Sequence, residues 1–265
     1  MQKIITLLFF FIFFLQGFSQ TDSARYSPVQ TKYSFDWGNN KTSILLTQYG
    51  TSAKIVMIHL HDDEIASDMA AKIVLERTGG LFIELENNGE RLMSFKKSGR
   101  RFLFDPNRIF TPAGLRKNLR LLNDHVTLAA VSSVKEFAAF ILQKIPDSLT
   151  SLIALHNNEN GKYSIKSYTA YGSHARDASE IHINPDRDPD NFFIVTDSTL
   201  FRELKMIGFN VVLQNTLKAK DDGSLSIYFG RGNVIYINVE AQKGRMRTQV
   251  KMLESLTGLM SISKR

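Results

Sequence analysis

Apolar runs rich in β-branched residues alternate with amphipathic stretches in the first half of the chain. Residues 54–60 (KIVMIHL) and 81–85 (LFIEL) have the composition of buried strands. Residues 68–77, which lie between them, have helical spacing and stop at Gly79-Gly80, a signal for a helix C-terminus. Strands that alternate with helices predict an α/β sandwich built around a mixed sheet.

The second half continues this alternation. Short apolar runs predict strands at residues 152–155, 192–196, 210–213, 224–229 and 234–239, the last two joined as a hairpin through Gly230-Arg231-Gly232. Helical spacing predicts helices at residues 115–145 (one long helix or a broken pair), 200–207 and 245–256. Residues 171–191 are polar and predict a long loop of the kind that is functional or mobile.

The first twenty residues form a separate segment. Lys3 precedes an apolar run over residues 4–15, which is shorter than the roughly 20 residues that a spanning helix needs. Small residues, Gly17 and Ser19, stand at positions −3 and −1 of a cut after Ser19. This pattern predicts a signal peptide over residues 1–19, the alternative being an uncleaved anchor. We therefore expect an exported protein, periplasmic or secreted, with one domain over residues 20–265 and no later membrane span.

The composition limits which metal ligands, nucleophiles and partners the protein can have. The chain has 265 residues, 43% of them hydrophobic and 22% charged, which is typical of a globular protein. It has no cysteine, which excludes disulfides, thiolate metal ligands and a cysteine nucleophile. Any metal must therefore be held by His, Asp or Glu. The net charge of +7 is spread along the chain and does not indicate a nucleic-acid partner.

Two segments with metal-binding residue types follow predicted strands. His61 and Glu64 form an H-x-x-E spacing directly after residues 54–60, and His156 follows residues 152–155. Two imidazoles and one carboxylate make a ligand set that zinc favours in catalytic sites. Alone, each motif is also compatible with a solvated histidine and a glutamate at a helix start.

Two further segments carry candidate site residues. In Asp105-Pro106-Asn107-Arg108-Ile109-Phe110, an Asn-Arg pair on a loop is suited to binding a carboxylate, although Asp and Pro also favour a simple turn. Glu240 lies near the end of an apolar strand, where desolvation would raise its pKa and make it a general base. Strand alternation places it on a mixed face, so solvent exposure remains the alternative.

The order of these motifs, H-x-x-E, then D-x-N-R-x-F, then a strand ending in His, then a strand carrying Glu, resembles the zinc carboxypeptidase superfamily. The segment D-P-N-R-I-F is especially similar to its aspartoacylase and succinylglutamate desuccinylase branch. The resemblance covers about residues 61–244. It implies a three-layer α/β sandwich with a central mixed, twisted sheet, and one Zn²⁺ per chain bound by His61, Glu64 and His156.

The same resemblance implies roles for the other residues. Asp105 would orient a zinc-bound imidazole. Asn107 and Arg108 would hold the substrate carboxylate. Arg100, with Arg101 as the alternative, would polarise the scissile carbonyl or hold an acidic group. Glu240 would act as general base toward the water that zinc activates.

The expected activity is therefore hydrolysis of an amide bond by an exported, metallocarboxypeptidase-like zinc enzyme. A small peptide or a cell-wall peptide is the expected substrate. Deacylation of an acyl-amino acid is the second enzymatic interpretation, and a non-catalytic carboxylate-binding module is the third. The segment after His156 matches no family motif, and the tyrosine that closes on substrate in carboxypeptidases cannot be placed from the sequence.

Overall fold

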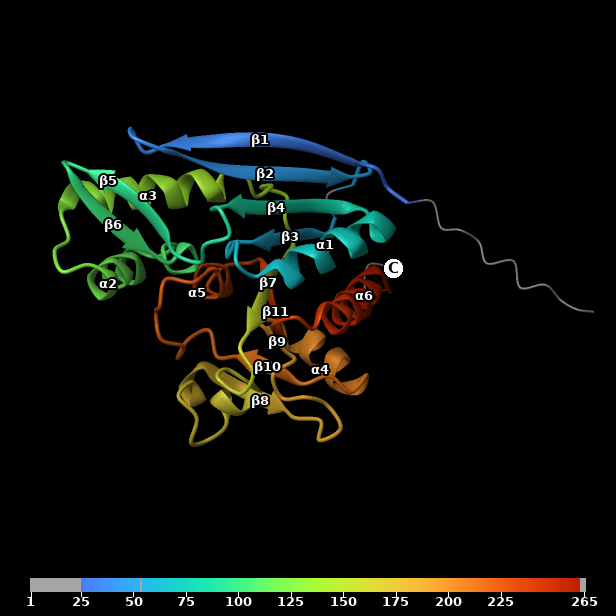
Figure 1. Ribbon diagram of the computed structural model, residues 1–265. Coiled ribbons are helices and arrows are strands. Elements are labelled where there is room, and N and C mark those ends of the chain that lie inside the picture. Colours follow the sequence, from blue (N-terminus) through green and yellow to red (C-terminus); the bar gives the residue numbers. More distant parts are fainter. Residues whose placement is uncertain (1–24, 53, 263–265) are drawn as a thin grey trace, which may run out of the picture.

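The computed structural model describes residues 25–52 and 54–262 (Figure 1). The predicted signal peptide lies outside these residues. Within the described part of the chain, nine strands form one mixed sheet and two more form a separate hairpin. A search of the same residues for a helix long and apolar enough to cross a membrane finds none.

The sheet has the strand order β1-β2-β4-β3-β7-β11-β9-β10-β8. In chain order its strands are β1 (Pro28–Asp36), β2 (Lys41–Tyr49), β3 (Val56–His59), β4 (Gly80–Glu86), β7 (Ser151–Asn158), β8 (Ala178–His182), β9 (Phe192–Val195), β10 (Val211–Gln214) and β11 (Ile235–Gln242). The four central strands, β4, β3, β7 and β11, are parallel. Their carboxyl ends therefore meet at one edge, which is where open α/β sheets bind ligands.

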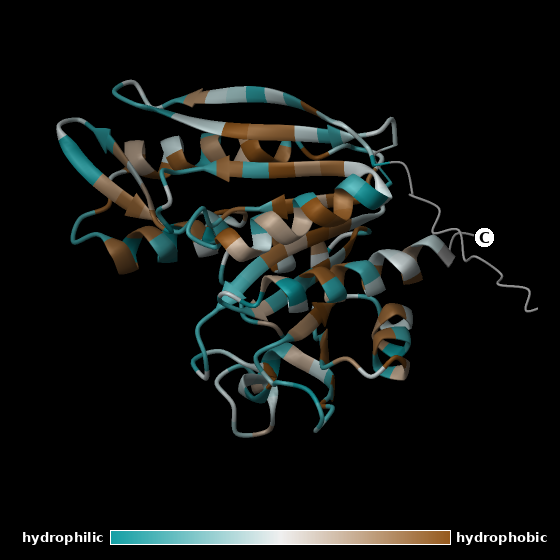
Figure 2. Ribbon diagram, turned by 45° about the vertical axis from the view of Figure 1, so that its right-hand side comes forward, coloured by the Kyte–Doolittle hydropathy of each residue, from teal (hydrophilic) through white to brown (hydrophobic). Residues whose placement is uncertain are grey.

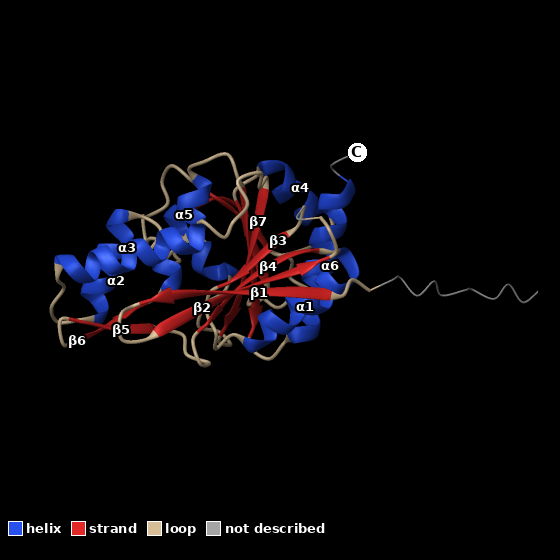
Figure 3. Cartoon of the chain, turned by 90° about the horizontal axis from the view of Figure 1, so that it is seen from above, coloured by secondary structure: helices blue, strands red, loops and turns tan. Residues whose placement is uncertain are grey.

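Helices cover both faces of the sheet, as Figure 3 shows from above. One face packs against α1 (Ile65–Thr78), α4 (Ser198–Met206) and α6 (Met246–Ile262), and the other against α2 (Pro112–Leu122), α3 (Leu128–Leu142) and α5 (Leu225–Gly230). Each face has its own apolar core, and hydrophobic residues follow the central strands in Figure 2. This arrangement confirms the predicted three-layer α/β sandwich with a mixed, twisted sheet.

Shorter elements complete the chain. The hairpin consists of β5 (Met93–Lys97) and β6 (Arg100–Phe104), and three 3₁₀ helices are η1 (Pro106–Arg108), η2 (Ile165–Tyr168) and η3 (Ala175–Asp177). The three 3₁₀ helices carry or border the site described below. Strand β3 is buried along its whole length, because both of its faces are covered by helices.

Alternation along β11 decides what faces each core. Ile237 and Val239 pack on the side of α1, α4 and α6, and Tyr236 packs on the opposite side. Asn238 and Glu240 share the face of Tyr236, because side chains two residues apart point the same way. Glu240 is buried on that face, so the solvent-exposed alternative is wrong.

Some predicted elements differ from the structure. Residues 224–229 are not a strand but largely helix α5, which buries Leu225 and Ile227 under the sheet; so short an apolar run does not distinguish the two. The predicted hairpin is therefore wrong, and the glycines of residues 230–232 end the helix instead. Residues 115–145 are the broken pair, α2 and α3. The predicted loop 171–191 contains η3 and β8, and β2 was not predicted.

Candidate active site

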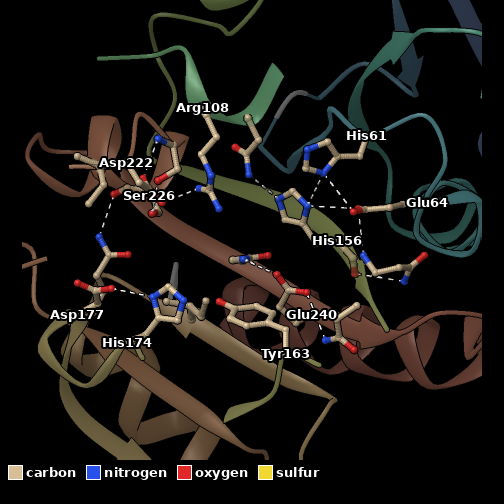
Figure 4. A pocket seen from close by; sticks show the side chains of 18 of the residues that line it. His61, Glu64, Arg108, His156, Tyr163, His174, Asp177, Asp222, Ser226 and Glu240 are labelled. Carbon is tan, nitrogen blue, oxygen red and sulfur yellow. Dashed lines mark hydrogen bonds and ion pairs between the residues drawn. The ribbon is translucent and has the colours of Figure 1, made fainter. Parts of the chain in front are cut away.

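Three neighbouring parallel strands bring the candidate ligands and base to one edge of the sheet. His61 and Glu64 lie in the turn between β3 and α1, where the Glu64 N–H donates to the His61 carbonyl (2.9 Å). That turn places both side chains on the same side. His156 lies on β7, and Glu240 on β11. All four line one cavity of about 410 Å³ (Figure 4).

The side chains of His61, Glu64 and His156 converge on one point. His61 Nδ1 lies 3.1 Å from Glu64 Oε1 and 3.3 Å from His156 Nδ1, and His156 Nδ1 lies 3.2 Å from Glu64 Oε2. All three side chains are buried. Ligands at about 2.0–2.1 Å from a tetrahedral zinc ion are about 3.3 Å apart, so the three observed distances fit such an ion.

The second ring nitrogen of each imidazole also has a partner. His61 Nε2 lies 2.9 Å from Asp105 Oδ1, and His156 Nε2 lies 3.3 Å from Asn107 Nδ2. A histidine that binds metal through Nδ1 carries its proton on Nε2 and donates it to an oxygen. Asp105 offers that oxygen directly.

Asn107 gives an independent test of the zinc site. Its Oδ1 is buried without a hydrogen-bond partner among the described residues, while its Nδ2 faces the ring nitrogen of His156. The two ends of an amide are exchanged by a half-turn about one bond. With a metal on His156 Nδ1, that half-turn pairs the orphaned oxygen with the Nε2–H of His156. The residues present therefore fit a bound zinc ion.

Electrostatics agree with this ligand set. Burial would lower the pKa of His61, but hydrogen bonds to Asp105 and Glu64 outweigh it and raise the pKa to about 9. Burial would raise the pKa of Asp105, but the contact with His61 and the charge of Arg108 bring it down to about 2. Burial likewise opposes ionisation of Glu64, whose pKa nevertheless falls well below normal beside His156 and His61. The site thus keeps two carboxylates ionised and attracts positive charge.

Glu240 is held by neutral amide groups, whereas the ligand residues are held by contacts with one another. Its carboxylate accepts hydrogen bonds from Asn238 Nδ2 (3.0 Å) and Asn158 Nδ2 (3.4 Å), one on each oxygen. Burial is the largest influence on Glu240 and raises its pKa, with the Glu64 charge adding to the effect and His156 opposing it. A buried carboxylate with an elevated pKa, next to but outside the ligand set, has the properties of a general base.

The Asp105–Arg108 segment is fixed by α2. Asn118 donates through Nδ2 to the Asp105 carbonyl (2.9 Å) and accepts the Asp105 N–H through Oδ1 (3.2 Å). Asn107 and Arg108 both line the cavity. Asn107 is occupied by His156, whereas the guanidinium of Arg108 forms an ion pair with Asp222 (Nη1 to Oδ2, 2.7 Å).

The structure does not bring Arg100 to the site. Arg100 is exposed on the β5–β6 hairpin opposite Lys97 and does not line the cavity, and Arg101 is exposed beside Ser94. Arg91, in the loop before β5, lines the cavity and lies 2.5 Å from Glu64 Oε1. The resemblance suggested Arg100, but the hairpin carries its side chain away from the ligands.

Several site residues were missed by the sequence analysis. These are Arg91, Asp222 and Asn238. Tyr163 and Tyr168, two of the tyrosines among which the sequence could not choose, also line the cavity, with their hydroxyls 2.5 Å apart. Arg91 and Asp222 lie in irregular loops, so no periodicity places them. Asn238 was accessible to sequence reasoning, because it stands two residues before Glu240 on the same strand face.

Comparisons with known proteins address the fold. No family model and no curated protein sequence matches the chain. Among solved structures, thrombin activatable fibrinolysis inhibitor, a carboxypeptidase, superposes with a TM-score of 0.50 at 10% identity, over 91% of this chain and 69% of that one. The succinylglutamate desuccinylase/aspartoacylase of Rhodobacter sphaeroides gives 0.47 at 12% identity, over 91% and 66%. A candidate metallopeptidase of Shewanella baltica gives 0.41 at 12%, over 87% and 86%. The chain thus shares its overall fold with the carboxypeptidase among these structures, thrombin activatable fibrinolysis inhibitor.

Proposed function

We propose that the protein is a zinc-dependent hydrolase of amide bonds, of the metallocarboxypeptidase type. The observation that carries this proposal is the juxtaposition of a buried His61–Glu64–His156 ligand set with Glu240, a buried carboxylate outside that set, in one cavity. A structural metal site would not require a base with an elevated pKa beside it.

When bound, zinc would polarise the scissile carbonyl and make water a nucleophile at neutral pH. Glu240 accepts the proton of the attacking water and passes it to the leaving amine, while Asn238 and Asn158 keep its two oxygens oriented. Asp105 and Asn107 fix the two imidazole rings through Nε2.

Two arginines bind the substrate in this proposal. Arg91 takes the role that the sequence assigned to Arg100, because its guanidinium lies beside Glu64 and can donate to the developing oxyanion. Arg108 holds the carboxylate of the substrate, since a guanidinium offers a planar pair of donors to a carboxylate. Asn107 supports the ring of His156 with one end of its amide.

The N-terminal segment supports export, so we propose small peptides, cell-wall peptides included, as substrates. The test is to incubate the chain from residue 20 onward, purified with one equivalent of zinc, with a library of peptides and acyl-amino acids. We expect mass spectrometry to find release of a carboxyl-terminal residue that a chelator abolishes and added zinc restores. Tight binding of library members with no cleavage would contradict the proposal and favour a carboxylate-binding module.

A further inference from the structure

The β5–β6 hairpin ends in four exposed cations that face one another. Its register places Lys96 opposite Arg101 and Lys97 opposite Arg100, and like charges directly opposite each other destabilise a strand pair. Both residues of the turn, 98 and 99, have positive φ (52° and 76°), as in a tight two-residue hairpin loop, so the strands cannot splay apart there. Within the part of the chain that the structure describes, no carboxylate forms an ion pair with any of the four. The hairpin therefore holds an unneutralised group of positive charges.

Helix α2 presents a second group of cations on its outer face. Leu119 lies on the buried face and packs in the core, whereas Arg116, Lys117 and Arg120 are exposed. Arg120 follows the other two by four and three residues, so the three side chains share one face of the helix. Leu121 is also exposed beside them. No acidic residue lies in α2, so this face has no countercharge of its own.

One side chain ties this helix to the hairpin. Asn123, directly after α2, accepts the Leu103 N–H through Oδ1 (2.8 Å) and donates through Nδ2 to the Leu103 carbonyl (2.8 Å), so the end of α2 lies against β6. Figures 1 and 3, seen from directions 90° apart, both place the hairpin and α2 at the same end of the molecule, opposite α4 and α6. The two groups form one surface, the cationic end, which comprises Lys96, Lys97, Arg100, Arg101, Arg116, Lys117 and Arg120.

The cationic end accounts for most of the net charge of the protein. Residues 93–128 contain eight Lys and Arg and two Asp and Glu, a net charge of +6, compared with +7 for the whole chain. The net charge is therefore concentrated at one end of the molecule, which corrects the expectation that it is spread along the chain. A concentrated positive charge of this kind attracts a polyanionic partner.

Two exposed leucines lie at the same end of the molecule. Leu121 on α2 is 74% exposed, and Leu128 at the start of α3 is 87% exposed. Lys and Arg together with exposed Leu are typical of surfaces that bind an anionic bilayer, where the cations meet the headgroups and the apolar side chains enter the boundary of the acyl chains. A nucleic acid makes no use of exposed leucines, and no aromatic side chain in residues 93–128 is exposed for stacking on bases.

We propose that the cationic end binds the protein to an anionic phospholipid surface. Its Lys and Arg side chains contact the phosphate groups, and Leu121 and Leu128 enter the interface. Anionic headgroups between the two strands of the hairpin relieve the repulsion between its opposed cations. No residue of the cationic end lines the cavity of the candidate active site, so this inference is independent of the proposed function.

Flotation with vesicles tests this on the chain from residue 20 onward, which keeps every described element and lacks the apolar run of residues 4–15. The vesicles are phosphatidylcholine, alone or with about one-third phosphatidylglycerol. Because each Lys or Arg near an anionic surface strengthens binding about fivefold, we expect at least about tenfold tighter binding to the anionic vesicles. Raising the salt concentration from about 0.1 M to 1 M should weaken that binding, because the Debye length falls from about 10 Å to 3 Å. Equal binding to both vesicles, binding to neither, or binding that salt does not weaken would overturn the inference.

Matched charge variants locate the contact. Replacing the four hairpin cations by Gln should weaken binding to the anionic vesicles at least about tenfold. The control replaces four exposed cations of α4 and α6 by Gln, which removes the same charge from the opposite end: Arg202, Lys205, Arg247 and Lys251. This control should bind nearly as the wild type does. An equal loss in both variants would assign the binding to net charge alone, and no loss in the hairpin variant would contradict the role of the hairpin.

The exposed leucines distinguish a bilayer from a nucleic acid. Leu121→Gln combined with Leu128→Gln keeps every charge and should still weaken binding to the anionic vesicles. Met206→Gln, at an 81% exposed position on α4, is the control and should not change it. Vesicle binding that is unchanged by the leucine replacements would contradict insertion into the interface. Tighter binding of a double-stranded oligonucleotide than of the anionic vesicles, at the same salt concentration, would reject the lipid as the partner.

Discussion

Glu240 on β11 is the register partner of His156 on the adjacent parallel strand β7. The proposed general base and one proposed metal ligand are therefore held side by side by the sheet itself. Neither residue depends on a flexible loop for its position. Sites built on strands hold their geometry more tightly than sites on loops, so this pairing gives the proposed reaction a rigid centre.

Replacing Glu240 should separate metal binding from catalysis. Glu240→Gln keeps the shape of the side chain and removes the proton acceptor, so kcat should fall by about 10²–10⁴-fold with zinc content unchanged. Steady-state kinetics and metal analysis of the same preparation check this. Loss of zinc in the variant would instead make Glu240 a ligand.

Removing a metal-ligand side chain should instead abolish zinc binding. His156→Ala leaves a buried carboxylate and one imidazole, so the protein should lose both zinc and the stabilisation that zinc confers on the wild type. A ligand present at a hundred times its dissociation constant stabilises the folded state by about 2.7 kcal/mol. Thermal unfolding with and without zinc checks this: a zinc-dependent rise in Tm is expected for the wild type only.

A matched pair of arginines tests the carbonyl-polarising role. Arg91→Gln should lower kcat by about 10²–10³-fold, the usual cost of removing an oxyanion donor. Arg100→Gln should have no effect, because Arg100 is exposed on the hairpin outside the cavity. A lower kcat in Arg100→Gln together with an unchanged kcat in Arg91→Gln would restore the assignment that the resemblance implied.

A buried carboxylate away from the site should make stability depend on pH. Burial, together with the hydrogen bond and charge of Asp68, raises the pKa of Glu84 from 4.5 to about 7, although Lys72 opposes this. Because the folded state binds this proton more tightly than the unfolded state, the contribution is complete below pH 4.5. It is lost as the pH rises through about 7.

Urea unfolding at pH 5 and pH 8 tests this directly. The loss of stability between the two values should be smaller in Glu84→Gln than in the wild type. Glu86→Gln, on the same strand but paired with Lys32 at the surface, should behave as the wild type does. Identical pH dependence in the wild type and Glu84→Gln would exclude the effect.

The sequence predicted the layers, and it predicted that His61, Glu64 and His156 form one group that could hold a metal, because both follow from local pattern. Residues 54–60 and 152–155 are apolar runs that end at His61 and His156, and the parallel sheet then brings their ends together. Arg91 and the segment carrying Asp222 could not be predicted, since their positions depend on loop conformation and on the contact of Gly223 with Gly114. Residues 224–229 were assigned to a strand because a short apolar run is compatible with either element.

The hydrogen-bond partner of Asn107 is another feature that the sequence could not predict. Its residue type was correctly associated with hydrogen bonding, but the sequence could not tell a substrate carboxylate from the ring of His156 as its partner. The structure shows the contact with the ring, which depends on the fold of η1 against β7 and brings the two side chains to 3.3 Å.

The central claim is that zinc bound by His61, Glu64 and His156 is required for hydrolysis of an amide bond. The most direct measurement is a titration of the chelator-treated protein with zinc, in which bound zinc and cleavage of a substrate from the peptide and acyl-amino-acid library are followed together. The account predicts activity that rises in proportion to zinc and reaches its maximum at one ion per chain, with Glu240→Gln binding the same zinc and remaining inactive. Full activity before zinc is added, or none on any peptide or acyl-amino acid at one zinc per chain, would contradict it.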